Sequence, residues 1–178
     1  IEDILFPIRV FKECGIKNLI ITNSAGSLKK ENPPGTIMII DGYINCTFQE
    51  SLNDPKIIKD EKFHSLELHA IAKEVALEND ISIASGNYCW TLGPTYETSS
   101  EIQYFTSLKG SSVGMSTLPE IQEGGNLGLK LLTLSLLTNY AAGISEKSLT
   151  HEEVLENAKK STSKMITLLC GIVKKVKT

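Results

Sequence analysis

The sequence predicts an α/β fold in which helices flank a mixed β-sheet. Short segments that are almost entirely apolar, such as residues 37–40 and 131–137, alternate along the chain with amphipathic segments at helical spacing, such as residues 68–76. Uniformly apolar strands are typical of sheets covered on both faces, and alternating strands and helices are typical of the α/β class. With 178 residues, 41% hydrophobic and 22% charged, the chain has the composition of a single folded domain, residues 1–178.

The N-terminal part of the chain is predicted to form a helix followed by two strands. Pro7 is expected in the first turn of the helix, and Gly15 is expected to end it. Residues 19–22 predict a buried strand that ends at the small residues 23–27. These small residues are predicted to form a turn whose backbone can approach a ligand closely. The apolar residues 37–40 predict the second strand.

The middle of the chain is predicted to contain a long loop, a helix and a broken strand. Residues 46–63 are polar, which indicates a surface loop, and loops of this length are often binding lids or parts of an interface. Residues 68–76 have helical spacing. Residues 81–92 are rich in β-forming residues but contain Gly86 and Asn87, so we expect either two short strands or one broken strand.

The C-terminal part begins with a helix whose start is marked by the capping box Thr98-Ser99-Ser100-Glu101. This helix places Glu97 just outside its N-terminus, where the helix dipole favours a carboxylate. The same signature at Thr150-His151-Glu152-Glu153 precedes a long amphipathic helix. The remaining predicted elements are a short strand, a helix and a long central strand, at residues 111–113, 119–127 and 130–137.

Charge and composition exclude several classes of function. The net charge of −3 gives no broad basic surface, so we expect neither nucleic acid nor an anionic membrane as the main partner. No apolar stretch approaches the roughly 18 to 20 residues of a membrane span, and the first residues carry acids, so we expect a cytoplasmic protein. The cysteines have neither paired nor metal-ligand spacing and predict no disulfide framework and no metal site: Cys14, Cys46, Cys89 and Cys170.

Two polar side chains stand at positions typical of a ligand site. Asn139 follows the apolar residues 131–137, and hydrogen-bonding groups at the carboxyl end of a strand commonly face a ligand crevice in α/β folds. Glu97 lies on a Gly-Pro turn. An amide and a carboxylate form a donor–acceptor pair suited to the edge of a flat heterocycle. Each also has an ordinary structural interpretation, as a residue that satisfies a turn or precedes a helix.

Four segments, nearly spanning the chain, resemble the purine nucleoside phosphorylases of the homotrimeric type. They are NSAG at 23–26, GPTYET at 93–98, VGMST at 113–117 and TNYAAG at 138–143. The resemblance implies a partly barrel-like mixed sheet flanked by helices. It also implies phosphate-dependent cleavage of purine nucleosides to free base and (deoxy)ribose 1-phosphate in purine salvage. Inorganic phosphate would be the co-substrate, with no cofactor and no metal, and the enzyme would be a homotrimer.

The resemblance assigns the catalytic roles to Asn139 and Glu97. In the family an Asn at this position accompanies 6-oxopurine nucleosides such as inosine and guanosine, whereas relatives that act on 6-aminopurines have an Asp. Asn139 would donate to N7 and O6 as the departing base gains negative charge, an interaction that strengthens in the transition state. Glu97 would accept from N1–H, which adenine lacks.

Further substrate contacts follow from the same resemblance. Tyr96 would flank the base, Met115 would line the ribose face, and Phe48 would be lent to the sugar pocket of a neighbouring subunit. The other predicted substrate-binding residues are Tyr88, Gly114, Thr138 and His151, and the predicted phosphate-binding residues are Ser24 and Ser116. Taken singly, each also has a structural interpretation, such as a packing turn for 113–117 and a helix-start histidine for His151.

The sequence departs from the family in two respects. Ser24 and Ser27 stand where the family more often has Ala and Gly. The family's N-terminal phosphate-binding segments have no counterpart here, and the chain opens at Ile1, so we expect a cleaved or partial enzyme, or a companion chain that supplies the missing segment. Two alternatives are a non-catalytic nucleoside-binding protein and a methylthioadenosine phosphorylase, and Asn139 argues against the second.

Overall fold

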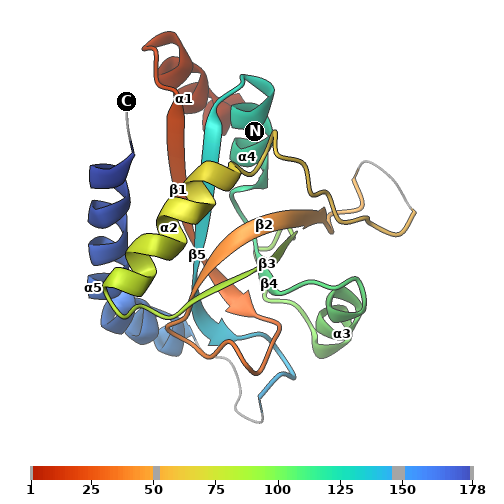
Figure 1. Ribbon diagram of the computed structural model, residues 1–178. Helices are drawn as coiled ribbons and strands as arrows, with labels where there is room; N and C mark the ends of the chain where they lie inside the picture. Colours follow the sequence, from red (N-terminus) through yellow and green to blue (C-terminus); the bar gives the residue numbers. More distant parts are fainter. Residues whose placement is uncertain (1, 50–52, 146–150, 177–178) are drawn as a thin grey trace.

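The computed structural model describes residues 2–49, 53–145 and 151–176, except for the side chains of 151–158 and 160. Within these residues the strands close into a small barrel, in the order β1 (Asn18–Ser27), β4 (Ser112–Gly114), β3 (Ile83–Trp90), β2 (Ile37–Asn45) and β5 (Lys130–Tyr140). Parallel and antiparallel pairs both occur, since β5 pairs in parallel with β1 and antiparallel with β2. The predicted mixed, partly barrel-like sheet is confirmed (Figure 1).

Helices cover the barrel from different sides (Figure 1). α2 (Leu66–Glu78) and α5 (His151–Lys175) pack on β5 and on each other, and α1 (Glu2–Glu13) packs on α4 (Leu118–Asn126). α3 (Ser99–Ser107) lies apart from them, beside β3 and β4. No helix of the described residues is long and apolar enough to cross a membrane.

The apolar strands are buried on both faces, as their composition predicted. In β2, Ile37 and Ile39 pack in the core under α2 and α5, whereas Met38 and Ile40 pack in the second core with residues of α1 and α4. This alternation follows from the period of two in a strand. Burial on both sides fixes the register of β2, because a slip by one residue would exchange the two faces.

Three predicted elements differ from the structure. α1 begins at Glu2, so Pro7 lies inside the helix rather than in its first turn. β1 continues through 23–27, because these small residues extend the parallel ladder with β5, so the predicted turn is wrong. β3 is one unbroken strand through Gly86 and Asn87, and the irregularity lies in its partner β2, after Ile40.

Candidate active site

A cavity of about 340 Å³ lies at the carboxyl ends of β1 and β5. Because these strands are parallel, their last residues meet at one edge of the barrel, where Gly26 pairs with Asn139. The turn after β4 and the loop after β3 complete the wall. The predicted site residues in the lining are Ser24, Tyr96, Glu97, Gly114, Met115, Ser116, Thr138 and Asn139. Segments far apart in sequence therefore form one cavity, at the place where α/β folds commonly bind ligands.

Asn139 is held rigidly in this wall. Its side chain is 5% exposed, its Oδ1 accepts a hydrogen bond from the Thr138 hydroxyl at 2.9 Å, and its Nδ2 donates to the Tyr140 carbonyl at 3.0 Å. Gly26 opposite has no side chain, and a Cβ there would lie 3.2 Å from Nδ2. An amide nitrogen has two N–H groups. The bond to Tyr140 therefore leaves one N–H for a ligand in the cavity.

Glu97 is half-buried and belongs to the same cavity. It directly precedes α3, whose predicted capping box is confirmed: the Thr98 amide donates to Glu101 Oε2 at 2.7 Å, and the Glu101 amide donates to Thr98 Oγ1 at 3.3 Å. The Thr98 amide and the Thr98 hydroxyl, which donates to the same carboxylate oxygen at 2.8 Å, lower the pKa of Glu101. Thr91, which sequence reasoning did not single out, donates its hydroxyl proton to Glu97 Oε1 at 2.7 Å.

The turn after β4 presents hydroxyl groups to the cavity. Ser116 Oγ and Thr117 Oγ1 lie 2.9 Å apart, and Asn23 donates from Nδ2 to Thr117 Oγ1 at 3.0 Å. Thr117 has φ of 83°, which is rare for a β-branched residue, and such backbone strain clusters at functional sites. Sequence reasoning missed Asn23, which lines the cavity, and Thr117, which is buried beside the lining, although both lie in the quoted motifs.

Tyr88 lies behind this turn rather than in the cavity lining. Its side chain is fully buried, it donates to the Ser116 carbonyl at 2.8 Å, and burial raises its pKa. A Cβ at Gly114 would lie 2.6 Å from the Tyr88 hydroxyl, so the glycine makes room for it. The structure gives Tyr88 a supporting position behind the turn, and its direct contact with the sugar stays a prediction.

Two other side chains form the outer wall. Met115 lies against the loop after β3, where a Cβ built on Gly93 would collide with its Sδ. Tyr96, on that loop, is 47% exposed at the mouth of the cavity. Its ring is therefore accessible to a ligand, consistent with the predicted flanking position.

Phe48 does not line the cavity. Phe48 is 41% exposed and stacks on Tyr104, with ring centroids 6.2 Å apart, in an adjoining hollow that also includes Tyr96 and Glu97. Its contact with a neighbouring subunit stays a prediction. His151 is the first residue of α5, and its side chain lies outside the described part of the structure.

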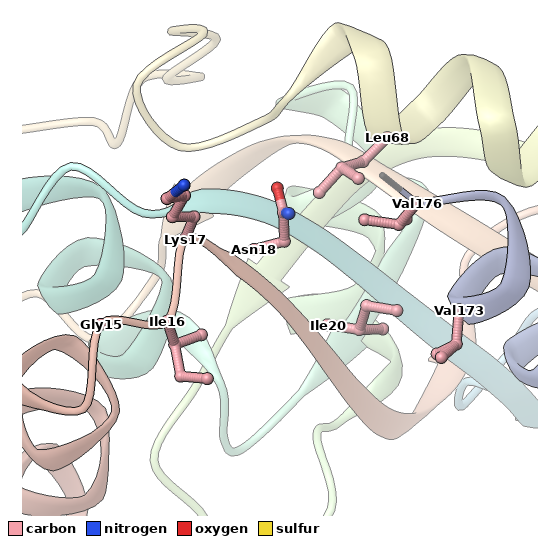
Figure 2. A pocket seen from close by; sticks show the side chains of 8 residues that line it. All are labelled: Gly15, Ile16, Lys17, Asn18, Ile20, Leu68, Val173 and Val176. Atoms are coloured by element: carbon pink, nitrogen blue, oxygen red, sulfur yellow. The ribbon is translucent and has the colours of Figure 1, made fainter. Parts of the chain in front are cut away.

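Another hollow, of about 370 Å³, lies between the segment before β1, β1 itself, α2 and α5 (Figure 2). Its lining is mostly aliphatic and offers few polar groups. The lining residues are Gly15, Ile16, Lys17, Asn18, Ile20, Leu68, Val173 and Val176. Among the residues that the structure describes, no group of three or more His, Cys, Asp or Glu side chains could hold a metal ion. The cavity with Glu97 and Asn139 is therefore the candidate active site.

Comparison with known proteins agrees with this geometry. The purine nucleoside phosphorylase 1 of Geobacillus stearothermophilus is 34% identical over 97% of this chain, and that of Bacillus subtilis (strain 168) is 33% identical over 97%. The chain spans 66% of the length of each. The crystal structure of Schistosoma mansoni purine nucleoside phosphorylase in complex with inosine superposes with a TM-score of 0.85 at 27% identity, covering 98% of this chain and 66% of the other.

The family model described as the phosphorylase superfamily matches residues 1–174, nearly the whole chain. The resemblance noted in the motifs is thus confirmed over the strands and loops that build the cavity. This chain belongs to the phosphorylase superfamily.

Proposed function

We propose that this chain carries the purine-binding site of a 6-oxopurine nucleoside phosphorylase. The reaction is cleavage of the N-glycosidic bond of inosine, guanosine and their deoxy forms by inorganic phosphate, giving the free base and (deoxy)ribose 1-phosphate for purine salvage. The observation that supports this function best is the presence of Glu97 and Asn139 in the lining of one cavity. The Pyrococcus furiosus relative, 30% identical over 90% of this chain, is named a 6-oxopurine nucleoside phosphorylase.

Asn139 would stabilise the leaving group. As the bond to C1′ lengthens, electrons flow into the purine and negative charge grows at N7 and O6. The remaining N–H of Asn139 then donates to a stronger acceptor than in the ground state, which raises turnover rather than affinity alone. The bond from Thr138 to Oδ1 keeps this amide in the donating orientation without reorganisation during the reaction.

Glu97 would select the base. Its carboxylate accepts a hydrogen bond from N1–H of hypoxanthine or guanine and, in guanine, from the exocyclic amine. Adenine lacks the N1 proton and would place a lone pair against the carboxylate. Sites that hydrogen-bond a substrate in this way discriminate strongly, because a wrong substrate leaves a polar group unpaired.

Ser24 and Ser116 would contact the phosphate nucleophile. Both line the cavity, and Ser116 is fixed by its neighbours: its hydroxyl meets that of Thr117, and its carbonyl accepts from Tyr88. The phosphate attacks C1′ as positive charge develops on the sugar, with the two reactants held in line. Because this displacement is neither an oxidation nor a reduction, we propose phosphate as co-substrate and no cofactor.

We further propose a cytoplasmic homotrimer in which Phe48 reaches the sugar pocket of the neighbouring subunit. The exposed position of Phe48, outside the cavity of its own chain, supports this arrangement of subunits. In the described part of the chain it stacks on Tyr104 and borders the hollow next to Glu97. Sedimentation of the purified chain would test the trimer directly.

The reaction is tested by incubating the chain with inosine, with and without phosphate, and measuring hypoxanthine and ribose 1-phosphate. We expect hypoxanthine only when phosphate is present, in equal amount to ribose 1-phosphate. Equal release without phosphate would indicate a hydrolase. Binding of hypoxanthine without any turnover would indicate a nucleoside-binding protein instead.

A further inference from the structure

Few contacts fix the position of Glu97, which lies at the end of the loop between β3 and α3. Residues 92–96 are all exposed, and Met115 lies against this segment at Gly93. Thr91 and Glu97, at its two ends, are half-buried. Glu97 also borders two hollows, the candidate active site and the adjoining hollow that contains Phe48. At this boundary the Glu97 carboxylate can point into either hollow.

Thr91 provides a fixed point at the start of this loop. It follows the last residue of β3, and its amide donates to the Gly114 carbonyl of β4 at 3.0 Å, so its backbone belongs to the rigid barrel. Its hydroxyl lies 2.7 Å from Glu97 Oε1 and 3.5 Å from the Gly114 carbonyl. A hydroxyl has one proton, and the shorter contact to the charged acceptor takes it.

We propose that Thr91 is a positioning residue that holds the Glu97 carboxylate at the base site and thereby supports the preference for 6-oxopurines. This inference rests on the proposed function. Thr91 borders the adjoining hollow and is not in the lining of the candidate active site, so its bond to the carboxylate does not occupy the base site. A carboxylate offers about four lone-pair sites, so the bond to Thr91 leaves acceptors for N1–H.

Loss of this hydroxyl would free the carboxylate to turn into the adjoining hollow. Valine has the shape of threonine but places a methyl group beside Oε1, which leaves that oxygen without its donor. Water in the adjoining hollow then hydrogen-bonds to the Glu97 carboxylate and competes with its orientation toward the base. The affected quantity is the affinity for bases that carry N1–H, since adenine has no proton to donate to this carboxylate.

The experiment measures the dissociation constants of hypoxanthine and adenine by calorimetry for the full chain and for variants at Thr91, Thr95 and Glu97. We expect Thr91→Val to weaken hypoxanthine roughly tenfold or more, in the range typical of a hydrogen bond to a charged group, with adenine unchanged. Thr91→Ser keeps the hydroxyl and should restore most of the affinity. Thr95→Val, the same change at an exposed position of the same loop, is the control and should bind as the unmodified chain does.

A double-mutant cycle separates positioning from general stability. In a Glu97→Gln background, Thr91→Val should add less than about a twofold loss, because the carboxylate that it positions is gone. Additive losses, or equal weakening of hypoxanthine and adenine, would overturn the inference, as would unchanged hypoxanthine affinity in Thr91→Val. If Thr91→Val fails to fold, Thr91→Ala gives the same comparison. If the unmodified chain neither binds hypoxanthine nor consumes inosine, the proposed function itself fails.

Discussion

Asn139 and Glu97 are held in the cavity by parts of the structure that differ in rigidity, a strand of the barrel and an exposed loop. Asn139 belongs to β5, which pairs with both β1 and β2, and both of its amide atoms are hydrogen-bonded to adjacent residues. Glu97 follows an exposed loop and depends on Thr91 and on the start of α3. The transition-state donor is thus preorganised by the barrel, whereas the group that reads the base is held by a few side-chain bonds.

Replacing the donor should change the choice of substrate. In Asn139→Asp the carboxylate has no N–H for O6 and N7, so we expect kcat/KM for inosine to fall about 10²- to 10³-fold, as when an oxyanion donor is removed. Relative use of adenosine and methylthioadenosine should rise, because a 6-amino group can donate to the new carboxylate. Steady-state kinetics with the three nucleosides measure both effects.

Asn126→Asp is the matched control for that substitution. Asn126 is exposed at the end of α4, so the same chemical change there should leave kinetics unaltered. Substrate choice that is unchanged by Asn139→Asp would count against the assignment of Asn139 and restore methylthioadenosine phosphorylase as a candidate.

The residues that sequence reasoning found and missed differ in a physical way. Glu97 and Asn139 were predicted because they follow a turn signal and an apolar strand. Thr91, Asn23 and Thr117 were not predicted as site residues, because their roles consist of side-chain bonds made only after folding, such as that between Asn23 and Thr117. Hydroxyl groups carry no periodic signal that could reveal such bonds.

At the level of elements, the sequence predicted the helices and strands that are marked by residues close together in the chain. The capping box placed the start of α3 correctly, and the apolar segment 37–40 lies within β2. The extension of β1 through 23–27 was missed because small residues favour turns in isolation, whereas pairing with β5 keeps them extended. The early start of α1 was missed because Pro7 usually marks a first turn.

The capping box of α3 should support both this helix and the base site. Thr98→Ala removes the side-chain acceptor for the Glu101 amide, at a cost of about 1 kcal/mol, which lowers Tm by roughly 2–4 °C for a domain of this size. Glu97 directly precedes Thr98, so hypoxanthine affinity should also fall. Scanning calorimetry and binding titrations measure the two effects.

Ser100→Ala, in the first turn of the same helix, is the control for this prediction. Ser100 is exposed and is not the capping residue, so its loss should leave Tm and binding close to those of the unmodified chain. Indistinguishable Tm values for Thr98→Ala and Ser100→Ala would show that the cap contributes nothing to stability.

At the level of the whole molecule, closure of the barrel creates the site. β1 and β5 bring their carboxyl ends together only because they are parallel neighbours, and β4 joins β1 to β3 so that the turn at Met115 and the loop at Glu97 face them. Strand periodicity predicted a mixed sheet but not its closure, since the pairing of strands distant in sequence leaves no local signal. The family resemblance supplied the barrel-like form.

Two buried histidines, His64 just before α2 and His69 within it, make the stability of the fold depend on pH. His64 is 4% exposed, and its pKa is lowered to about 4. Burial is the largest cause, the nearby His69 and Lys59 act in the same direction, and Asp41 opposes the shift. Burial also lowers the pKa of His69. Between about pH 6.5 and pH 4 the unfolded chain therefore binds more protons than the folded chain. The free energy of unfolding decreases as the pH is lowered through that range.

We expect His64 alone to remove on the order of 3 kcal/mol of stability between neutral pH and about pH 4. Urea unfolding at pH values from 7.5 to about 4 measures this slope, and the stability should be fully present above the unfolded pKa of about 6.5. His64→Gln has no titrating group, so its unfolding free energy should decline less steeply as the pH falls. An identical decline in both proteins would mean that His64 can take up a proton without cost, through rearrangement of the surrounding core. The charged ring would then have to reach water while the barrel stays closed, which its position between Tyr43 and His69 opposes.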